Sequence, residues 1–214
     1  MGDSSTGSSE LGITILNTLM ATTVEQDSRF EGVGLNPAFI ASSSILIFLE
    51  TTRFGLFLGT TGGRGFAIAK VGGSWSAPCY VTMRKVELGA IIGYSSSYTI
   101  ISGISKRAIQ EIIDDNYTEF GTDVTVQLWP KEAGVDDAVS VNSSDFVSAS
   151  CSNGVLFDFS LSGGSLRIDT KKNAQVYGES GSSASEILNG VTPKPKDMVP
   201  LYQKISTISR AALN

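Results

Sequence analysis

The chain has no histidine and only two cysteines, Cys79 and Cys151, among its 214 residues. Histidine is the usual general base near neutral pH, the commonest metal ligand and the central member of Ser-His-Asp and Cys-His catalytic arrangements. The two cysteines lie far apart in the sequence and form no Cys-x-x-Cys pair, so they offer no recognisable zinc or iron–sulfur site. We therefore expect a protein that is not an enzyme, with no catalytic residue, no metal and no cofactor.

Charge is scarce as well, because charged residues make up 17% of the chain and the formal net charge is −5. Nucleic-acid binding needs clustered Lys and Arg, so we expect no nucleic-acid partner. The same acidic balance weakens any general attraction to anionic lipid. The apolar content of 41% is ample for a core, and the length suits one compact domain.

Long hydrophobic stretches are also missing. No apolar run reaches the roughly 18–20 residues of a membrane span. The first residues, MGDSSTGSSE, have neither the basic nor the apolar region of a secretory signal. We expect a cytoplasmic protein, peripheral on membranes at most, whose two cysteines stay reduced. A single disulfide between Cys79 and Cys151 is left open by the sequence.

Glycine-rich breaks divide the chain into short apolar or alternating segments, a pattern typical of antiparallel hairpins. The pattern predicts turns at Thr60-Thr61-Gly62-Gly63 and at Val71-Gly72-Gly73. Strands are expected over residues 45–49, 54–58, 65–70, 75–83, 86–94, 98–102, 124–128, 155–161 and 166–169. The expected fold class is α+β: an antiparallel sheet, partly closed or barrel-like, with helices at the N-terminus, in the middle and at the C-terminus.

Residues 1–9 are rich in Ser and Gly and are expected to form a flexible leader, followed by a single domain over residues 10–214. Leu11, Ile15 and Leu19 fall at helical spacing and predict the N-terminal helix.

Cap signals mark the other helices. A short helix should start at Pro37, and Ser105 should cap the middle helix. Ser183 and Glu186 have the spacing of a capping box, and the C-terminal helix is expected over residues 197–212.

Two motifs invite a chemical reading. The acidic pairs Asp114-Asp115 and Asp136-Asp137 lie in polar stretches, and we interpret them as solvated surface. The cluster Gly62-Gly63-Arg64-Gly65 lacks the spacing of a phosphate-binding loop. We interpret it as a hairpin turn that needs positive φ, with Arg64 at its tip.

Two separated blocks of the sequence resemble SYLF domains. The first covers residues 36–83 and consists of Asn36-Pro37, Ile45 to Phe48, Gly55-Leu56-Phe57, Gly62-Gly63-Arg64-Gly65 and Gly73-Ser74-Trp75-Ser76-Ala77-Pro78. The second is similar to the closing strands of the family and its Asn-Ala-x-x-Tyr-Gly signature, in residues 152–157, 160–164, 173–178 and 183–190. Together the match covers roughly residues 10–190. The central Gly-Pro-x-Gly-Arg element of many relatives is replaced here by residues 129–134, Trp-Pro-Lys-Glu-Ala-Gly.

The resemblance implies a non-enzymatic module that binds phosphoinositide-containing membranes and, in some members, actin or actin-assembly factors. Family members often insert an N-terminal amphipathic helix, for which Leu11, Ile15 and Leu19 would form the apolar face. The basic residues available for lipid headgroups are Arg53, Arg64, Lys70, Arg84 and Lys85, with Lys171 and Lys172 close to the Asn-Ala signature.

Each of these expectations has an alternative. Residues 10–28 contain no Lys or Arg, which an interfacial helix normally carries, so this helix can instead pack on the sheet of its own domain. The basic residues attract anionic headgroups only if they converge on one face. The chain can also be a structural subunit of a larger assembly without lipid binding. Met1-Gly2-Asp3-Ser4-Ser5-Thr6 formally fits N-myristoylation, and an ordinary leader explains it as well.

Overall fold

The computed structural model describes residues 6–21, 35–55, 58–88, 93–115, 117–119, 146–152, 155–157 and 164–212. Their centre is one antiparallel sheet in the order β6-β9-β4-β2-β1-β5-β7-β8, with β3 paired to β2. Among the described strands this order is a linear path whose two ends do not pair, so the sheet is open and not closed into a barrel. The antiparallel α+β fold expected from the sequence is confirmed.

The four longest strands form the middle of the sheet: β1 (Ile45–Gly55), β2 (Leu58–Val71), β4 (Cys79–Leu88) and β5 (Gly93–Gly103). The outer strands are β9 (Gly164–Ile168), β6 (Tyr117–Glu119), β7 (Phe146–Ser152) and β8 (Val155–Phe157), and β3 (Ser74–Trp75) is a short addition to β2. The single strand expected over residues 86–94 is wrong, because Val86 to Leu88 belong to β4 whereas Gly93 and Tyr94 belong to β5, and β2 and β1 lie between these two strands in the sheet. Residues 124–128 lie outside the described part.

The helices lie on both faces of the sheet. They are α1 (Thr6–Ala21), α2 (Pro37–Ala41), α3 (Lys106–Asp115), α4 (Thr170–Tyr177), α5 (Ala184–Leu188), the 3-10 helix η1 (Lys196–Met198) and α6 (Val199–Ala211). We call the face packed against α1, α2 and α6 the α1 face, and the face packed against α3 and α5 the α3 face.

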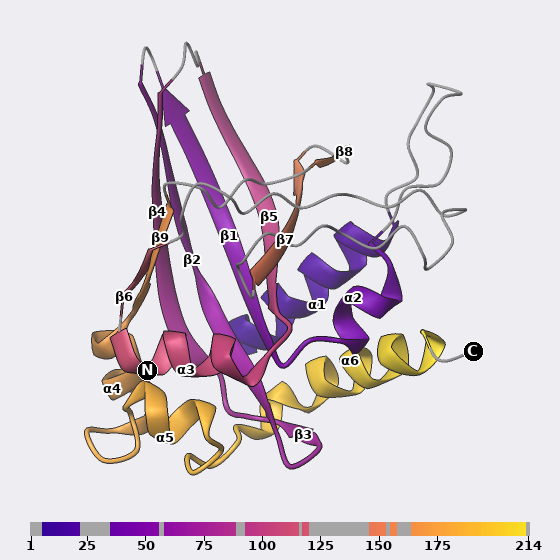
Figure 1. Ribbon diagram of the computed structural model, residues 1–214, viewed down its shortest axis with the longest axis vertical. Helices are drawn as coiled ribbons and strands as arrows, with labels where there is room; N and C mark the ends of the chain where they lie inside the picture. The colour runs from indigo at the N-terminus through magenta and orange to yellow at the C-terminus, as the bar shows by residue number, and fades with distance from the viewer. Residues whose placement is uncertain are drawn as a thin grey trace.

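Strand β1 shows how the two cores share one sheet. Its apolar run is buried on both sides, and alternate residues point to opposite faces. Ile45, Ile47 and Leu49 join the cluster on the α3 face, whereas Leu46 and Phe48 join the one on the α1 face. Beyond Leu49 the strand continues with the polar residues 50–53 and ends with Phe54 and Gly55. In Figure 1 this far end of β1, β2, β4 and β5 extends well past the helices.

The helix start expected at Pro37 and the caps expected at Ser105 and Ser183 are confirmed. Asn36 caps α2, and the Ser105 hydroxyl accepts a hydrogen bond from the Ala108 N–H at 3.3 Å. Ser183 and Glu186 form the reciprocal capping box of α5. Hydrogen bonds from the Ser183 side chain and backbone lower the pKa of the Glu186 carboxyl, which keeps it ionised in this box. The helical segment formed by η1 and α6 agrees with the C-terminal helix expected over residues 197–212.

Two expectations about the first third of the chain need revision. Helix α1 already begins at Thr6, so residues 6–9, expected to belong to a flexible leader, are helical, and Ser8 and Ser9 are buried. The cluster Gly62-Gly63-Arg64-Gly65 is not a turn, since all four residues lie inside β2 and pair with β1 on one side and β4 on the other.

Close packing of the backbone is why glycine is needed inside β2. A Cβ atom at Gly65 would overlap the carbonyl oxygen of Phe48 and lie 2.8 Å from its carbonyl carbon. Gly72 and Gly73, by contrast, have positive φ and form the turn that the sequence predicted between β2 and β3.

Candidate ligand-binding groove

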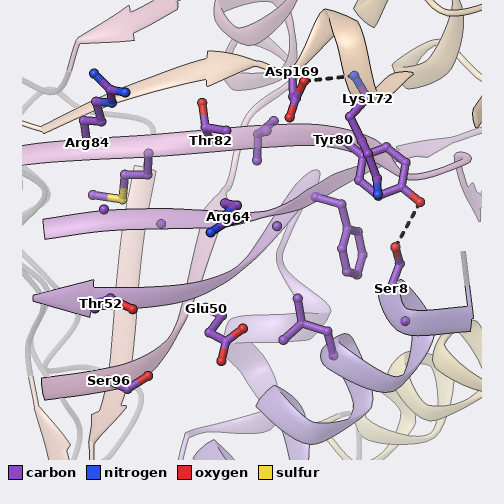
Figure 2. A pocket seen from close by; sticks show the side chains of 18 of the residues that line it. Ser8, Glu50, Thr52, Arg64, Tyr80, Thr82, Arg84, Ser96, Asp169 and Lys172 are labelled. Atoms are coloured by element: carbon purple, nitrogen blue, oxygen red, sulfur yellow. Dashed lines mark hydrogen bonds between the residues drawn. The ribbon is translucent and has the colours of Figure 1, made fainter. Parts of the chain in front are cut away.

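Beyond the helices, the α1 face of the sheet becomes polar and is hollowed into an open groove of about 950 Å³. Alternation along the strands places Glu50 and Thr52 of β1 on the same face as the buried Phe48. The same rule brings side chains from the three neighbouring strands into the groove, namely Arg64 of β2, Thr82 and Arg84 of β4, and Ser96 of β5 (Figure 2).

The strand register fixes how these side chains neighbour one another. Arg64 lies directly opposite Glu50 on one side and Thr82 on the other. Arg84 lies opposite Gly62, and a Cβ atom at Gly62 would have no heavy atom within 4 Å. Both arginines are exposed. Arg84 lies two residues along β4 from Thr82, the direct partner of Arg64. Such diagonal neighbours are about 7–8 Å apart, so one ligand with several phosphates can contact both arginines.

The first turn of α4 forms one rim of the groove. The Asp169 carboxylate accepts a hydrogen bond from the Lys172 N–H at 2.9 Å and caps the helix. The Lys172 ammonium group lies 5.3 Å from the centre of the Tyr80 ring, and the Tyr80 hydroxyl accepts a hydrogen bond from Ser8 of α1 at 3.0 Å (Figure 2). Contacts between α1, β4 and α4 therefore hold this rim in place.

The charge of the groove differs in sign from that of the chain. Three basic residues line it, Arg64, Arg84 and Lys172, against the acidic Glu50 and Asp169. The whole chain carries −5. Fixed positive groups in a concave surface concentrate the local field, so this groove favours an anion even on an acidic protein.

Comparison with known proteins then places the chain in a family. A family profile described as "Ysc84: Las17-binding protein actin regulator" matches residues 84–208, more than half of the chain. The chain belongs to the Ysc84 family. This confirms the resemblance to SYLF domains drawn from the sequence.

Individual relatives agree with this assignment. The chain is 28% identical over 175 residues to SH3 domain-containing YSC84-like protein 1 of Xenopus laevis, which covers 81% of this chain and 52% of the relative. It is 27% identical over 172 residues to the human protein of the same name, covering 79% of this chain and 50% of the relative. The chain thus spans about half the length of these Ysc84 relatives.

The Asn-Ala-x-x-Tyr-Gly signature, residues 173–178, connects α4 to the start of β4 through hydrogen bonds. Asn173 is fully buried, and its side chain accepts a hydrogen bond from the Tyr80 N–H at 2.8 Å and donates one to the Tyr80 carbonyl at 3.4 Å. The Tyr177 hydroxyl donates to the Pro78 carbonyl at 2.6 Å, and burial raises the pKa of Tyr177, so it remains a protonated donor at neutral pH. The signature thereby positions Tyr80 and Lys172 at the groove.

Helix α6 of this Ysc84 domain contributes a similar connection. The Tyr202 hydroxyl donates to the Ser76 carbonyl at 2.6 Å, and burial likewise raises the pKa of Tyr202. The Trp-Ser-x-Pro element of the first sequence block therefore serves as an anchor for two tyrosines, with Trp75 itself buried on the α1 face.

The five headgroup candidates do not all converge. Arg64 and Arg84 share the groove. Arg53 and Lys85 each lie next to a groove residue along their strand, Thr52 and Arg84, so their side chains point to the α3 face. In the register both are paired with Thr61 of β2, one on either side. Lys85 there is only 8% exposed.

The remaining lysines lie at different distances from the groove. Lys70 is six residues from Arg64 along β2, about 20 Å away, and lies near the Trp75 ring, with its ammonium group 6.0 Å from the ring centre. Of Lys171 and Lys172, only Lys172 is among the groove-lining residues.

The apolar face of α1 lies against the sheet. Ile15 and Leu19 have no exposed surface and belong to the core of the α1 face, while Leu11 is partly buried and lines the groove. Insertion of these side chains into a bilayer would require α1 to leave the sheet.

Several groove residues were not singled out from the sequence, among them Glu50, Thr52, Thr82 and Ser96. A signal for them exists, because Phe48, Glu50 and Thr52 continue the period of two from an apolar into a polar segment of the same strand. The acids that were weighed lie elsewhere: Asp114 and Asp115 end α3, and Asp136 and Asp137 fall outside the described residues.

The part of the chain that the structure describes contains neither a cluster of metal ligands nor a helix that could span a membrane. No three His, Cys, Asp or Glu side chains in this part of the Ysc84 domain lie close enough together to hold a metal ion. None of the helices described combines the length and the apolar character needed to span a bilayer.

Both cysteines are buried free thiols on opposite sides of the sheet, Cys79 in the core of the α3 face and Cys151 in that of the α1 face. The sheet between them prevents a disulfide. Burial raises the pKa of the Cys79 thiol to about 12, so the reactive thiolate is scarce at neutral pH.

We expect neither thiol of the folded protein to react with Ellman's reagent at pH 7.5 within minutes, and both to react in guanidinium chloride. Rapid reaction of the native protein would contradict this placement.

Proposed function

We propose that this Ysc84-family domain is a non-catalytic adaptor that links phosphoinositide-containing membranes to the regulation of actin assembly. The observation that carries the proposal is that Arg64, Arg84 and Lys172 all line one open groove. A phosphorylated inositol headgroup presents several phosphates on one ring, and guanidinium groups pair with phosphate oxygens through two parallel hydrogen bonds.

The polar floor of the groove suits such a ligand. Thr52, Thr82 and Ser96 supply hydroxyl groups that both donate and accept hydrogen bonds, as the free hydroxyls of an inositol ring require. Glu50 accepts hydrogen bonds from ring hydroxyls and repels a phosphate from its own position. The groove opens at the surface of the sheet, which lets a headgroup enter while its lipid stays in the bilayer.

The link to actin rests on the family description, "Las17-binding protein actin regulator". We propose that an actin-assembly factor is a partner of this chain. The chain spans about half of its relatives, so partner binding by the whole relatives does not assign residues here.

Neutralising both groove arginines tests the lipid site. Each basic residue near an anionic surface contributes about 1 kcal/mol, so Arg64→Gln with Arg84→Gln should weaken binding to phosphatidylcholine vesicles containing phosphatidylinositol bisphosphate by roughly 30-fold. Binding is measured by vesicle co-sedimentation, with actin co-sedimentation run beside it.

The matched control removes the same charge elsewhere. Lys106 and Lys196 are exposed outside the groove, so Lys106→Gln with Lys196→Gln should leave vesicle binding within about twofold of the wild type. Equal losses in the two double variants would mean that total charge, and not the groove, determines binding. A wild-type protein that ignores phosphoinositide but still binds an actin-assembly factor would favour the structural-subunit alternative.

A further inference from the structure

Two large aromatic side chains are exposed next to each other at the far end of the sheet. Phe54 of β1 and Tyr94 of β5 are direct cross-strand partners on the α1 face. Phe54 is 58% exposed and Tyr94 is 72% exposed. Phe54 is the last residue but one of β1, and Tyr94 is the second residue of β5. This end of the two strands extends beyond the helices (Figure 1). Side chains of this size are rarely left in water without a role when they stand as a pair at the tip of a structure.

The aromatic pair continues directly into the groove, of which Tyr94 is itself a lining residue. The register orders the side chains by distance from the tip. The row of Phe54 and Tyr94 comes first, the row of Thr52, Ser96 and Arg84 second, and the row of Glu50 and Arg64 third. Successive rows on one face are about 7 Å apart.

This spacing matches the layers of a bilayer. The polar headgroup region on each side of the hydrocarbon core is about 5–8 Å thick, and aromatic side chains favour the boundary between the two regions. With Phe54 and Tyr94 at that boundary, Arg84 lies at the level of the lipid phosphates. Arg64 lies about 7 Å further out, where a phosphorylated inositol ring projects from the surface.

We propose that Phe54 and Tyr94 are the membrane-contacting tip of this domain, which docks on an anionic bilayer with the end of its sheet. The proposal rests on the membrane function proposed above and adds the orientation and the penetrating side chains. Apolar rings meet the lipid interior and arginines meet the headgroups, so the surface is complementary to a bilayer in both polarity and charge. Helix α1 can stay on the sheet in this mode, with Ile15 and Leu19 buried.

A fluorescent label at the tip tests the contact directly. Both native cysteines are buried, so a thiol-reactive NBD dye added to Phe54→Cys labels position 54 alone. On phosphatidylcholine vesicles containing phosphatidylinositol bisphosphate, we expect its emission to shift to the blue and to be quenched by spin-labelled lipid acyl chains. The same dye on Ser180→Cys, an exposed position outside the groove, should show neither effect.

A second measurement separates insertion from headgroup recognition. Phe54 is not among the residues that line the groove, so Phe54→Ser should weaken vesicle binding roughly tenfold while leaving the affinity for soluble inositol phosphate unchanged. Val191 is 70% exposed away from the groove, and Val191→Ser is the matched control that should bind vesicles like the wild type.

The possible failures are distinguishable. If the wild type binds no vesicles, both the proposed function and this inference fail. A different result overturns only this inference. In that case the wild type binds and the arginine variant loses binding, but the dye at position 54 emits as it does in water and the Phe54→Ser variant binds normally. Loss of actin-factor binding by the Phe54→Ser variant with intact vesicle binding would assign the tip to a protein partner and would also overturn it.

Discussion

Replacing Gly65 by alanine should destabilise the fold by about 3 kcal/mol. The new Cβ atom would overlap the backbone carbonyl of Phe48 and lie 3.1 Å from the Leu49 Cα atom. These are backbone atoms of the neighbouring strand, so no side-chain rotation relieves the overlap. Relief requires β1 and β2 to separate at the centre of the sheet, where both cores depend on their pairing.

Gly62→Ala is the matched control for this prediction. Gly62 lies in the same cluster and the same strand, and a Cβ atom there would have no heavy atom within 4 Å. Its unfolding free energy should change by less than about 0.5 kcal/mol. Urea denaturation followed by circular dichroism measures both variants. The assignment of the cluster to a strand interior would be wrong if Gly65→Ala were as stable as Gly62→Ala.

The second large effect is expected at the signature asparagine. Asn173→Ala removes two hydrogen bonds to the Tyr80 backbone and leaves the buried Tyr80 N–H without its partner. Each lost bond costs about 1 kcal/mol, and an unsatisfied buried donor costs about 1–3 kcal/mol. The Tyr80 carbonyl keeps the bond it accepts from the Asp169 N–H. The expected loss is therefore about 3 kcal/mol in the free energy of unfolding.

The control for Asn173 lies on the same helix. Gln175 is exposed on α4, so Gln175→Ala should change stability by less than about 0.5 kcal/mol. Because α4 also carries Lys172 at the groove rim, Asn173→Ala should in addition raise hydrogen-exchange rates in α4 and at Tyr80. A loss below 1 kcal/mol with unchanged exchange would contradict the role of Asn173 in connecting α4 to β4.

Features that depend on a few neighbouring residues were readable in advance. Helix α2 begins at Pro37 as expected, and Ser105 and the Ser183 and Glu186 pair cap their helices as expected, since a cap is satisfied within one turn. The turn at Gly72 and Gly73 was equally local. The family resemblance was visible because separated blocks of residues occurred in the right order, and the profile match confirmed it.

The sequence predicts structure poorly where one residue type serves two physical purposes. Glycine permits positive φ, but it also permits close approach of two backbones, and the sequence does not distinguish these uses. Gly65 serves the second, so the expected turn is a strand interior. The extent of β1 was also missed, because the apolar run ends at Leu49 while backbone pairing with β2 and β5 continues to Gly55 regardless of side-chain polarity.

The sequence by itself determined the absence of histidine chemistry, the antiparallel α+β class and the helix caps, because these follow from residue types and short-range spacing. Only the tertiary structure decided which basic residues meet. Arg64 and Arg84 lie on one face of the sheet, and Arg53 and Lys85 lie on the other. Alternation along each strand sets the face of a side chain, and the pairing register sets its neighbours, which are distant in sequence. Whether a face is covered or open depends on where the helices pack. That packing buried Ile15 and Leu19 and left the groove and its aromatic tip exposed.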